Sequence, residues 1–142
     1  MRKHIPFLQV LSVNHFNMKI FGVYNARSGL VGEASYLLGK LLGTTHCSFC
    51  DITHSIFTKK KEWNNFIQDF EIPILAIHIN EQNDDMKKIT LGRTPCIVLQ
   101  EEEDYFLLMD EYSLTECIGE VKRFKEKLQE AMNNYKQSSK NI

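Results

Sequence analysis

The sequence predicts a single α/β domain built on about four strands. Four apolar runs have the composition of strands, at residues 20–24, 72–79, 96–99 and 105–109. Segments with helical periodicity lie between or after them, and a short acidic tip joins the last two runs as a hairpin. The chain has 142 residues, of which 43% are hydrophobic, so it is long enough for one core.

The first predicted unit is a buried strand followed by a helix. Residues 20–24, I-F-G-V-Y, end at a turn with the sequence N-A-R-S-G. Apolar residues then recur at helical spacing from Leu30 to Leu42, and Gly43 is the expected C-terminal cap. This pattern predicts a helix over residues 30–42.

The middle of the chain predicts a helix and then a strand. Trp63, Phe66, Ile67 and Phe70 repeat at the spacing of an amphipathic helix that faces the core. In residues 72–79 apolar side chains occupy both the even-numbered and the odd-numbered positions, which is typical of a strand covered on both faces. His78 ends this run, and we expect a neighbouring group to satisfy its ring. Residues 81–91 are polar and predict a loop or a short surface helix.

The last segment predicts one long closing helix. Ser113 and Glu116, in S-L-T-E, have the spacing of a capping box that starts a helix at Ser113. The predicted buried stripe consists of Leu114, Ile118, Val121, Phe124, Leu128 and Met132. Residues 134–142 are polar and are expected to fray, so the predicted domain spans residues 18–133.

Residues 1–17 predict an extension outside this domain. They carry basic residues and an apolar run that Pro6 and Gln9 interrupt, which is unlike a signal peptide. No apolar run approaches the length of a membrane span. The net charge of −1 gives no electrostatic basis for binding nucleic acid or an anionic membrane. We therefore expect a cytoplasmic protein without nucleic-acid or membrane partners, and the oligomeric state stays open.

The stretch T-H-C-S-F-C-D-I-T-H, residues 45–54, concentrates the chemistry of the chain. In a helix, Cys47, Cys50 and His54 would share one face. One interpretation is structural, in a non-enzymatic domain that packs or interacts, because free cysteine behaves as a small hydrophobe. Four cysteines are too few for the disulfide scaffold of a small secreted protein, and C-x-x-C in a cytosolic chain is more typical of redox or metal sites.

The redox interpretation assigns a role to each cysteine. The unpaired N–H groups of a helix start and the adjacent His46 would favour the Cys47 thiolate. Cys47 would attack and Cys50 would resolve the mixed disulfide, with an unknown protein or a small thiol as partner and no cofactor. On this interpretation Cys47 is partly exposed and Cys50 is the more buried.

The metal interpretation uses the same segment. Zinc or iron would be held by Cys47, Cys50, His54 and either His46 or Cys96. Motifs of other chemistries are absent from the sequence: it has no H-E-x-x-H, no G-x-S-x-G, no G-x-G-x-x-G and no C-x-x-C-H.

The order of elements resembles the thioredoxin-like fold over residues 19–132, which implies a mixed sheet with flanking helices. In that family a threonine- or isoleucine-proline step with a cis proline introduces the hairpin, and Thr94-Pro95 stands in the matching place. The resemblance implies that Pro95 is cis and that this step lies beside the reactive cysteines, where the backbone pairs with an extended substrate. The family carries C-x-x-C directly after the first strand, whereas residues 25–29 here contain no cysteine, so the family's catalytic pair has no match at that place.

The chain also resembles small bacterial proteins of unknown role that share Y-N-A-x-S-G-L and C-x-x-C-D-[IL]-T segments. Some of them are labelled GTPases. In this sequence Leu41 follows Gly39-Lys40, and Ala34 stands where a phosphate loop needs glycine, so the residues do not support that activity.

Overall fold

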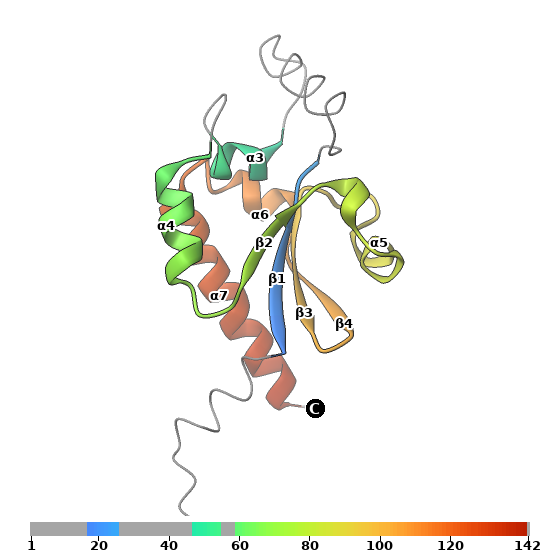
Figure 1. Ribbon diagram of the computed structural model, residues 1–142. Helices are drawn as coiled ribbons and strands as arrows, with labels where there is room; N and C mark the ends of the chain where they lie inside the picture. The colour runs from blue at the N-terminus through green and yellow to red at the C-terminus, as the bar shows by residue number, and fades with distance from the viewer. Residues whose placement is uncertain (1–16, 26–46, 55–58, 142) are drawn as a thin grey trace, which may run out of the picture.

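The computed structural model describes residues 17–25, 47–54 and 59–141, which form helical layers on both faces of a mixed sheet (Figure 1). The predicted helix over residues 30–42 lies outside these ranges. In chain order the elements are β1 (Met18–Val23), α3 (Ser48–Thr53), α4 (Lys61–Asp69), β2 (Ile74–Ile77), the 3-10 turn η1 (Ile79–Glu81), α5 (Asp84–Thr90), β3 (Cys96–Glu101), β4 (Asp104–Met109), α6 (Glu111–Thr115) and α7 (Val121–Lys140).

The four described strands form one sheet in the order β2-β1-β3-β4. β1 pairs in parallel with β2, with Ile20 opposite Ile74. β1 pairs antiparallel with β3, and β3 pairs antiparallel with β4. The prediction of an α/β fold on a mixed sheet of four strands is confirmed.

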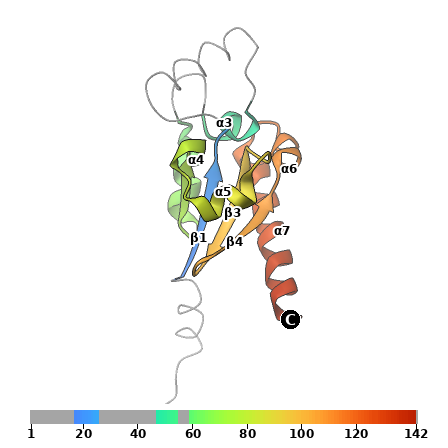
Figure 2. The ribbon, with the colours of Figure 1, turned by 90° about the vertical axis from the view of Figure 1, so that its right-hand side faces the viewer.

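The larger core lies between the sheet and the helices α4 and α7, which share one side of it (Figure 2). Trp63 and Phe66 of α4 are buried, as their periodicity predicts, and the Trp63 ring lies 5.4 Å from that of Phe124 on α7. The opposite face of the sheet carries α5 and a smaller cluster of buried residues, which are Val23, Met86, Cys96 and Val98.

The closing helix differs from its prediction. It is divided into α6 and α7, and Asp110 rather than Ser113 caps α6. The Ser113 backbone N–H donates to the Asp110 carboxylate at 2.8 Å, which holds the pKa of Asp110 below its usual range. Ile118 and Gly119 have φ of 46° and 74°, so the chain leaves the helical region between the two helices. Ile118 is consequently 64% exposed instead of buried in the stripe. α7 continues to Lys140, beyond the predicted end of the domain at residue 133.

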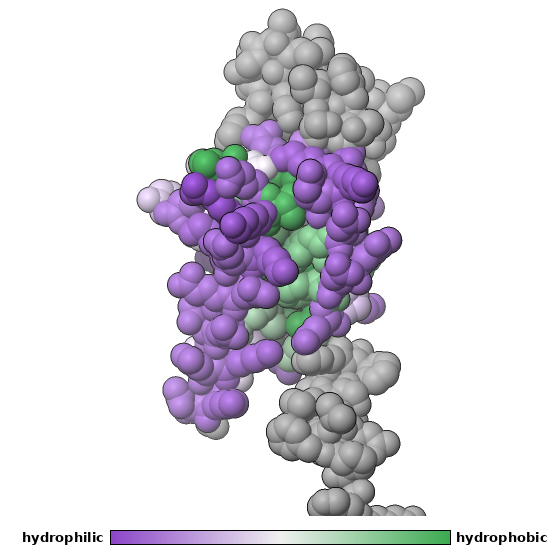
Figure 3. All heavy atoms as spheres, turned by 90° about the vertical axis from the view of Figure 1, so that its left-hand side faces the viewer, coloured by the Kyte–Doolittle hydropathy of each residue, from purple (hydrophilic) through white to green (hydrophobic). Residues whose placement is uncertain are grey.

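The groove between α4 and α7 exposes part of the core. Phe66, Phe70, Ile72 and Met132 contribute its apolar lining. Figure 3 views this side of the molecule and shows an apolar strip between hydrophilic borders. None of the described helices combines the length and the apolarity that a membrane span needs.

Candidate functional site

Cys47 and Cys50 form a disulfide at the start of α3. Their Cα atoms lie 5.2 Å apart, and the Cys50 backbone N–H points at the Cys47 sulfur at 3.3 Å. Cys47 is the residue that caps α3, with extended backbone angles. The disulfide therefore closes a short loop at the N-terminus of α3, and the Cys50 backbone N–H is directed at the Cys47 sulfur.

Both cysteines of this disulfide are buried, which corrects the expectation that Cys47 is partly exposed. Cys47 is 1% exposed and Cys50 is 5% exposed. Because Cys47 caps α3 instead of lying on an outer turn, its side chain points toward the core together with that of Phe49. A reagent that attacks this disulfide needs a local opening of the segment.

Phe49 anchors α3 on the sheet. Its ring is fully buried and lies 4.8 Å from the ring of Tyr24, the residue that follows β1, and 5.6 Å from Trp63. Gly22 of β1 provides the space, since a Cβ atom at this position would overlap the Phe49 ring. The packing of one aromatic residue against one glycine therefore fixes the disulfide beside the carboxyl end of β1.

A buried hydroxyl cluster lies next to the disulfide and was not identified from the sequence. The Tyr24 hydroxyl donates to Thr53 Oγ1 at 3.0 Å, and Thr53 Oγ1 lies 2.6 Å from His54 Nδ1. Thr53 Oγ1 also lies 3.4 Å from the Cys50 carbonyl oxygen. Burial raises the pKa of Tyr24, so its hydroxyl keeps its proton and acts as a donor. The only sequence signal is a tyrosine at the end of an apolar strand.

His54 is not placed as the helical periodicity predicts. It ends α3 with extended backbone angles, so it does not share a helical face with Cys47. Its ring lies 5.7 Å from that of Tyr24. The Tyr24 ring is also 5.2 Å from that of His78, whose Nδ1 bonds the Glu81 carboxylate at 2.6 Å. The expectation that a neighbour satisfies His78 is confirmed.

The Thr94–Pro95 step lies at the same end of β1 as the disulfide. Its peptide bond is cis. The Thr94 hydroxyl donates to the Asn25 side chain at 3.1 Å, and Asn25 follows Tyr24, which contacts α3. α3 and the Thr94–Pro95 step are far apart in the sequence. They nevertheless contact neighbouring residues, Tyr24 and Asn25, at the carboxyl end of β1. Pro95 leads directly into β3, where Cys96 is opposite Val23.

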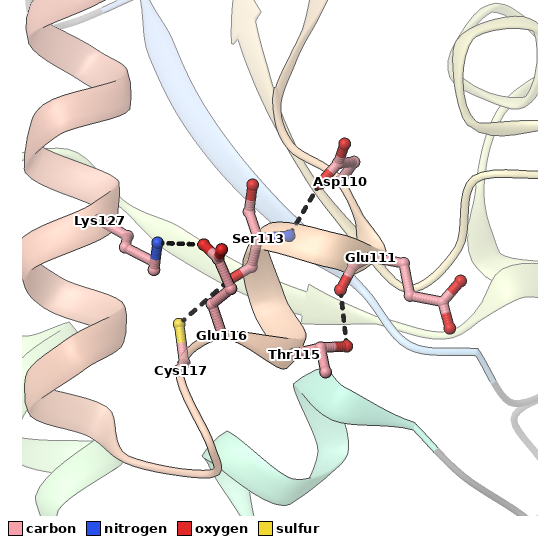
Figure 4. Close-up of polar contacts among 7 residues, drawn as sticks. All are labelled: Asp110, Glu111, Ser113, Thr115, Glu116, Cys117 and Lys127. Atoms are coloured by element: carbon pink, nitrogen blue, oxygen red, sulfur yellow. Dashed lines mark hydrogen bonds and ion pairs between the residues drawn. The ribbon is translucent and has the colours of Figure 1, made fainter.

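The other two cysteines are free and fully buried. Burial raises the pKa of Cys96 to about 12, although the charge of Arg93 acts against this shift. Burial also raises the pKa of Cys117 to about 11. Figure 4 shows the Cys117 sulfur directed at the Ser113 carbonyl oxygen, 3.5 Å away, beside the ion pair of Lys127 with Glu116. Neither thiol is suited to react at neutral pH.

The residues of the metal interpretation do not assemble in the described part of the chain. Within those ranges no group of three or more histidine, cysteine, aspartate or glutamate side chains could hold a metal ion. Cys96 faces the α5 side of the sheet, whereas Cys47 and Cys50 belong to the larger core on the other side. His46 lies outside the described residues.

Comparisons with protein-family models, with curated proteins and with solved structures find no match to this chain.

Proposed function

We propose that this chain is a thiol–disulfide redox domain of the thioredoxin-like class, with Cys47 and Cys50 as its reversible disulfide. One observation carries the proposal: the two cysteines are bonded, and their helix contacts the end of β1 to which Thr94 also attaches. The mixed sheet and the hairpin led by Pro95 are consistent with that class.

The geometry favours Cys47 as the nucleophile of the reduced pair. The Cys50 N–H that lies 3.3 Å from the Cys47 sulfur would stabilise a negative charge there, and a charge-assisted hydrogen bond is stronger than a neutral one. Cys50 Sγ is then the resolving thiol. This assignment is the one that the sequence predicts.

The proposed reaction is two successive exchanges. The Cys47 thiolate attacks a disulfide R–S–S–R′, a bond forms between Cys47 and RS, and R′S⁻ leaves and takes up a proton. The Cys50 thiolate then attacks the Cys47 sulfur, RS⁻ leaves and is protonated, and the Cys47–Cys50 bond forms. Two electrons pass from the protein to the substrate, and the protons lost by the two cysteines match those gained by the two leaving thiols.

The burial of the pair favours a small thiol or disulfide as the partner. A protein disulfide must reach the sulfur atoms with an entire chain segment, whereas a molecule of tripeptide size needs a smaller opening of α3. The net charge of the chain is −1, so its overall charge gives no preference for a strongly charged partner.

The test is a redox titration of the full chain in buffers with different ratios of reduced to oxidised glutathione, followed by thiol trapping and peptide mass spectrometry. We expect Cys47 and Cys50 to change together in one two-electron transition. Cys47→Ser and Cys50→Ser should each abolish it, and Cys96→Ala should leave it unchanged. A pair that stays bonded at every ratio, or never bonds, contradicts the proposal.

Metal analysis of the same protein, purified without chelator, distinguishes the alternative function. One zinc or iron per chain that is released when Cys47 and Cys50 are alkylated would support the metal site and would exclude the disulfide as the working state.

A further inference from the structure

The groove between α4 and α7 has borders of opposite charge. Its α4 border carries Glu62 and Asp69, and its α7 border carries Lys125 and Lys136. The two acids and the two lysines are exposed, and they form no ion pair within the described residues. The groove, about 560 Å³ in volume, lies between the two borders. Each border therefore presents charges that the described part of the chain does not pair.

An apolar strip lies between these borders, on the side of the molecule that Figure 3 views. It includes Phe66, Phe70 and Met132, of which Phe70 is only partly buried. An apolar patch with a polar rim is typical of a surface that binds another protein. A partner that covers this strip must match an acidic border on one side and a basic border on the other.

α4 and α7 begin at the same end of the groove and run in the same direction along it (Figure 1). The amine of Lys60, which precedes α4, donates to the carbonyl oxygen of Gly119, which precedes α7, at 2.5 Å. In the first turns of the two helices, the ring of Trp63 lies 5.4 Å from that of Phe124. Lys125 follows Phe124 directly, so it lies at the level of α4 along the groove.

A second copy of the chain has the charges that such a partner needs. A two-fold axis that lies in the interface and runs parallel to the groove would place α4 of each copy against α7 of the other, with every residue at its own level. Each acidic border would then face a basic border, and Lys125 of one copy would lie at the level of the α4 acids of the second copy. An axis across the groove would instead bring α4 against α4 and α7 against α7, where like charges repel.

We propose that two copies of this chain associate through the groove between α4 and α7, about a two-fold axis that runs along it. The lining residues on α7 extend from Lys125 to Lys136, which is about 16 Å of helix. Two helices side by side are about 20 Å wide. A face of these dimensions is at the small end of protein interfaces, so the dimer dissociates on dilution.

Sedimentation equilibrium of the full chain, at concentrations up to several hundred micromolar, tests the proposal by charge exchange. We expect a monomer–dimer equilibrium for the wild type. The basic variant carries Glu62→Lys and Asp69→Lys, and the acidic variant carries Lys125→Glu and Lys136→Glu. Each should weaken association by at least about tenfold, because attractions become repulsions and the two-fold axis repeats them. An equimolar mixture of the two should associate again, since one is basic on both borders and the other is acidic on both.

The matched control for the basic variant is Glu103→Lys with Glu130→Lys. It makes the same change in net charge at residues that do not line the groove. It should associate like the wild type, and it should associate with the acidic variant much less than the basic variant does. A wild type that stays monomeric at every concentration overturns the proposal and leaves the groove to a different partner. Association that neither groove variant weakens, or that their mixture does not restore, also overturns it.

Cross-linking distinguishes the two axes without reversing a charge. Chains with Glu62→Cys are mixed with chains with Lys125→Cys, oxidised and mapped by peptide mass spectrometry. The axis along the groove predicts disulfides that join residue 62 of one variant to residue 125 of the other, with few links between identical chains. Links that form mainly between identical chains, or equal yields of every combination, would contradict the proposed arrangement.

Discussion

The ring of Phe49 occupies the space that a side chain on Gly22 would fill. This relationship joins α3, and with it the Cys47–Cys50 disulfide, to the first strand. We predict that Gly22→Ala lowers the free energy of unfolding by about 1–3 kcal/mol, because overpacking displaces a buried ring. Urea denaturation followed by tryptophan fluorescence measures the change.

The control for Gly22→Ala is Gly92→Ala. Gly92 has φ of 73°, and no described atom lies within 4 Å of the place that a Cβ would take, so only backbone strain of about 1 kcal/mol is expected there. Phe49→Leu combined with Gly22→Ala should show a favourable coupling, since the smaller side chain leaves room for the new methyl group. Strict additivity of the two substitutions would show that Gly22 and Phe49 do not constrain each other.

The Thr53 hydroxyl should stabilise the fold through Tyr24 and His54. Thr53→Val keeps the shape but leaves the buried Tyr24 hydroxyl without its acceptor, a loss of about 1–3 kcal/mol. Thr53→Ser keeps the oxygen and should cost less. In the double variant Tyr24→Phe, Thr53→Val both polar partners are absent, so its cost should fall below the sum of the single costs. Equal costs for the serine and valine variants would show that the hydroxyl is not stabilising.

The four cysteines should differ in their rate of alkylation. In the reduced, metal-free chain we expect Cys47 to react fastest with iodoacetamide, because the Cys50 N–H favours its thiolate. Cys96 and Cys117 should react more slowly at the same pH, because burial raises the pKa of each of these thiols. Peptide mass spectrometry across pH 5–9 ranks the sites. If Cys47 reacts no faster than Cys117 at pH 7, the redox proposal is wrong.

Stability should decline in alkaline solution. In the folded chain the pKa is about 12 for Cys96 and about 11 for Cys117, whereas a thiol in the unfolded chain ionises near 8.5. Between these values the unfolded state binds fewer protons, so the free energy of unfolding is unaffected below about pH 8.5 and falls as the pH rises toward 11. The slope reaches at most about 1.4 kcal/mol per pH unit for each thiol.

Urea denaturation of the chain from pH 7 to 10.5 measures this slope. Cys96→Ala should reduce it, because one of the two buried thiols is then absent. The raised pKa of Tyr24 adds a similar loss only above about pH 10, the usual value for tyrosine. Stability that is equal at pH 8 and pH 10 would show that the two thiols are not shielded as described.

Local pattern along the chain is sufficient to predict several elements of the fold. The apolar runs predict the four strands of the described residues, and the stripe from Trp63 to Phe70 predicts α4, because both patterns can be recognised in the order of residues along the chain. The hairpin tip at Glu102 and Glu103 follows from local composition in the same way.

Other features depend on contacts between distant residues, and only the folded chain reveals them. Phe49 packs against Gly22, 27 residues away in the sequence, and the bond between Tyr24 and Thr53 joins residues 29 apart. The division of the closing helix is another such case: the Lys60 amine donates to the Gly119 carbonyl oxygen at 2.5 Å, and Asp110 rather than Ser113 accepts the capping bond. Helical periodicity continues through this break, because a pattern of side chains does not record which backbone groups find partners elsewhere in the fold.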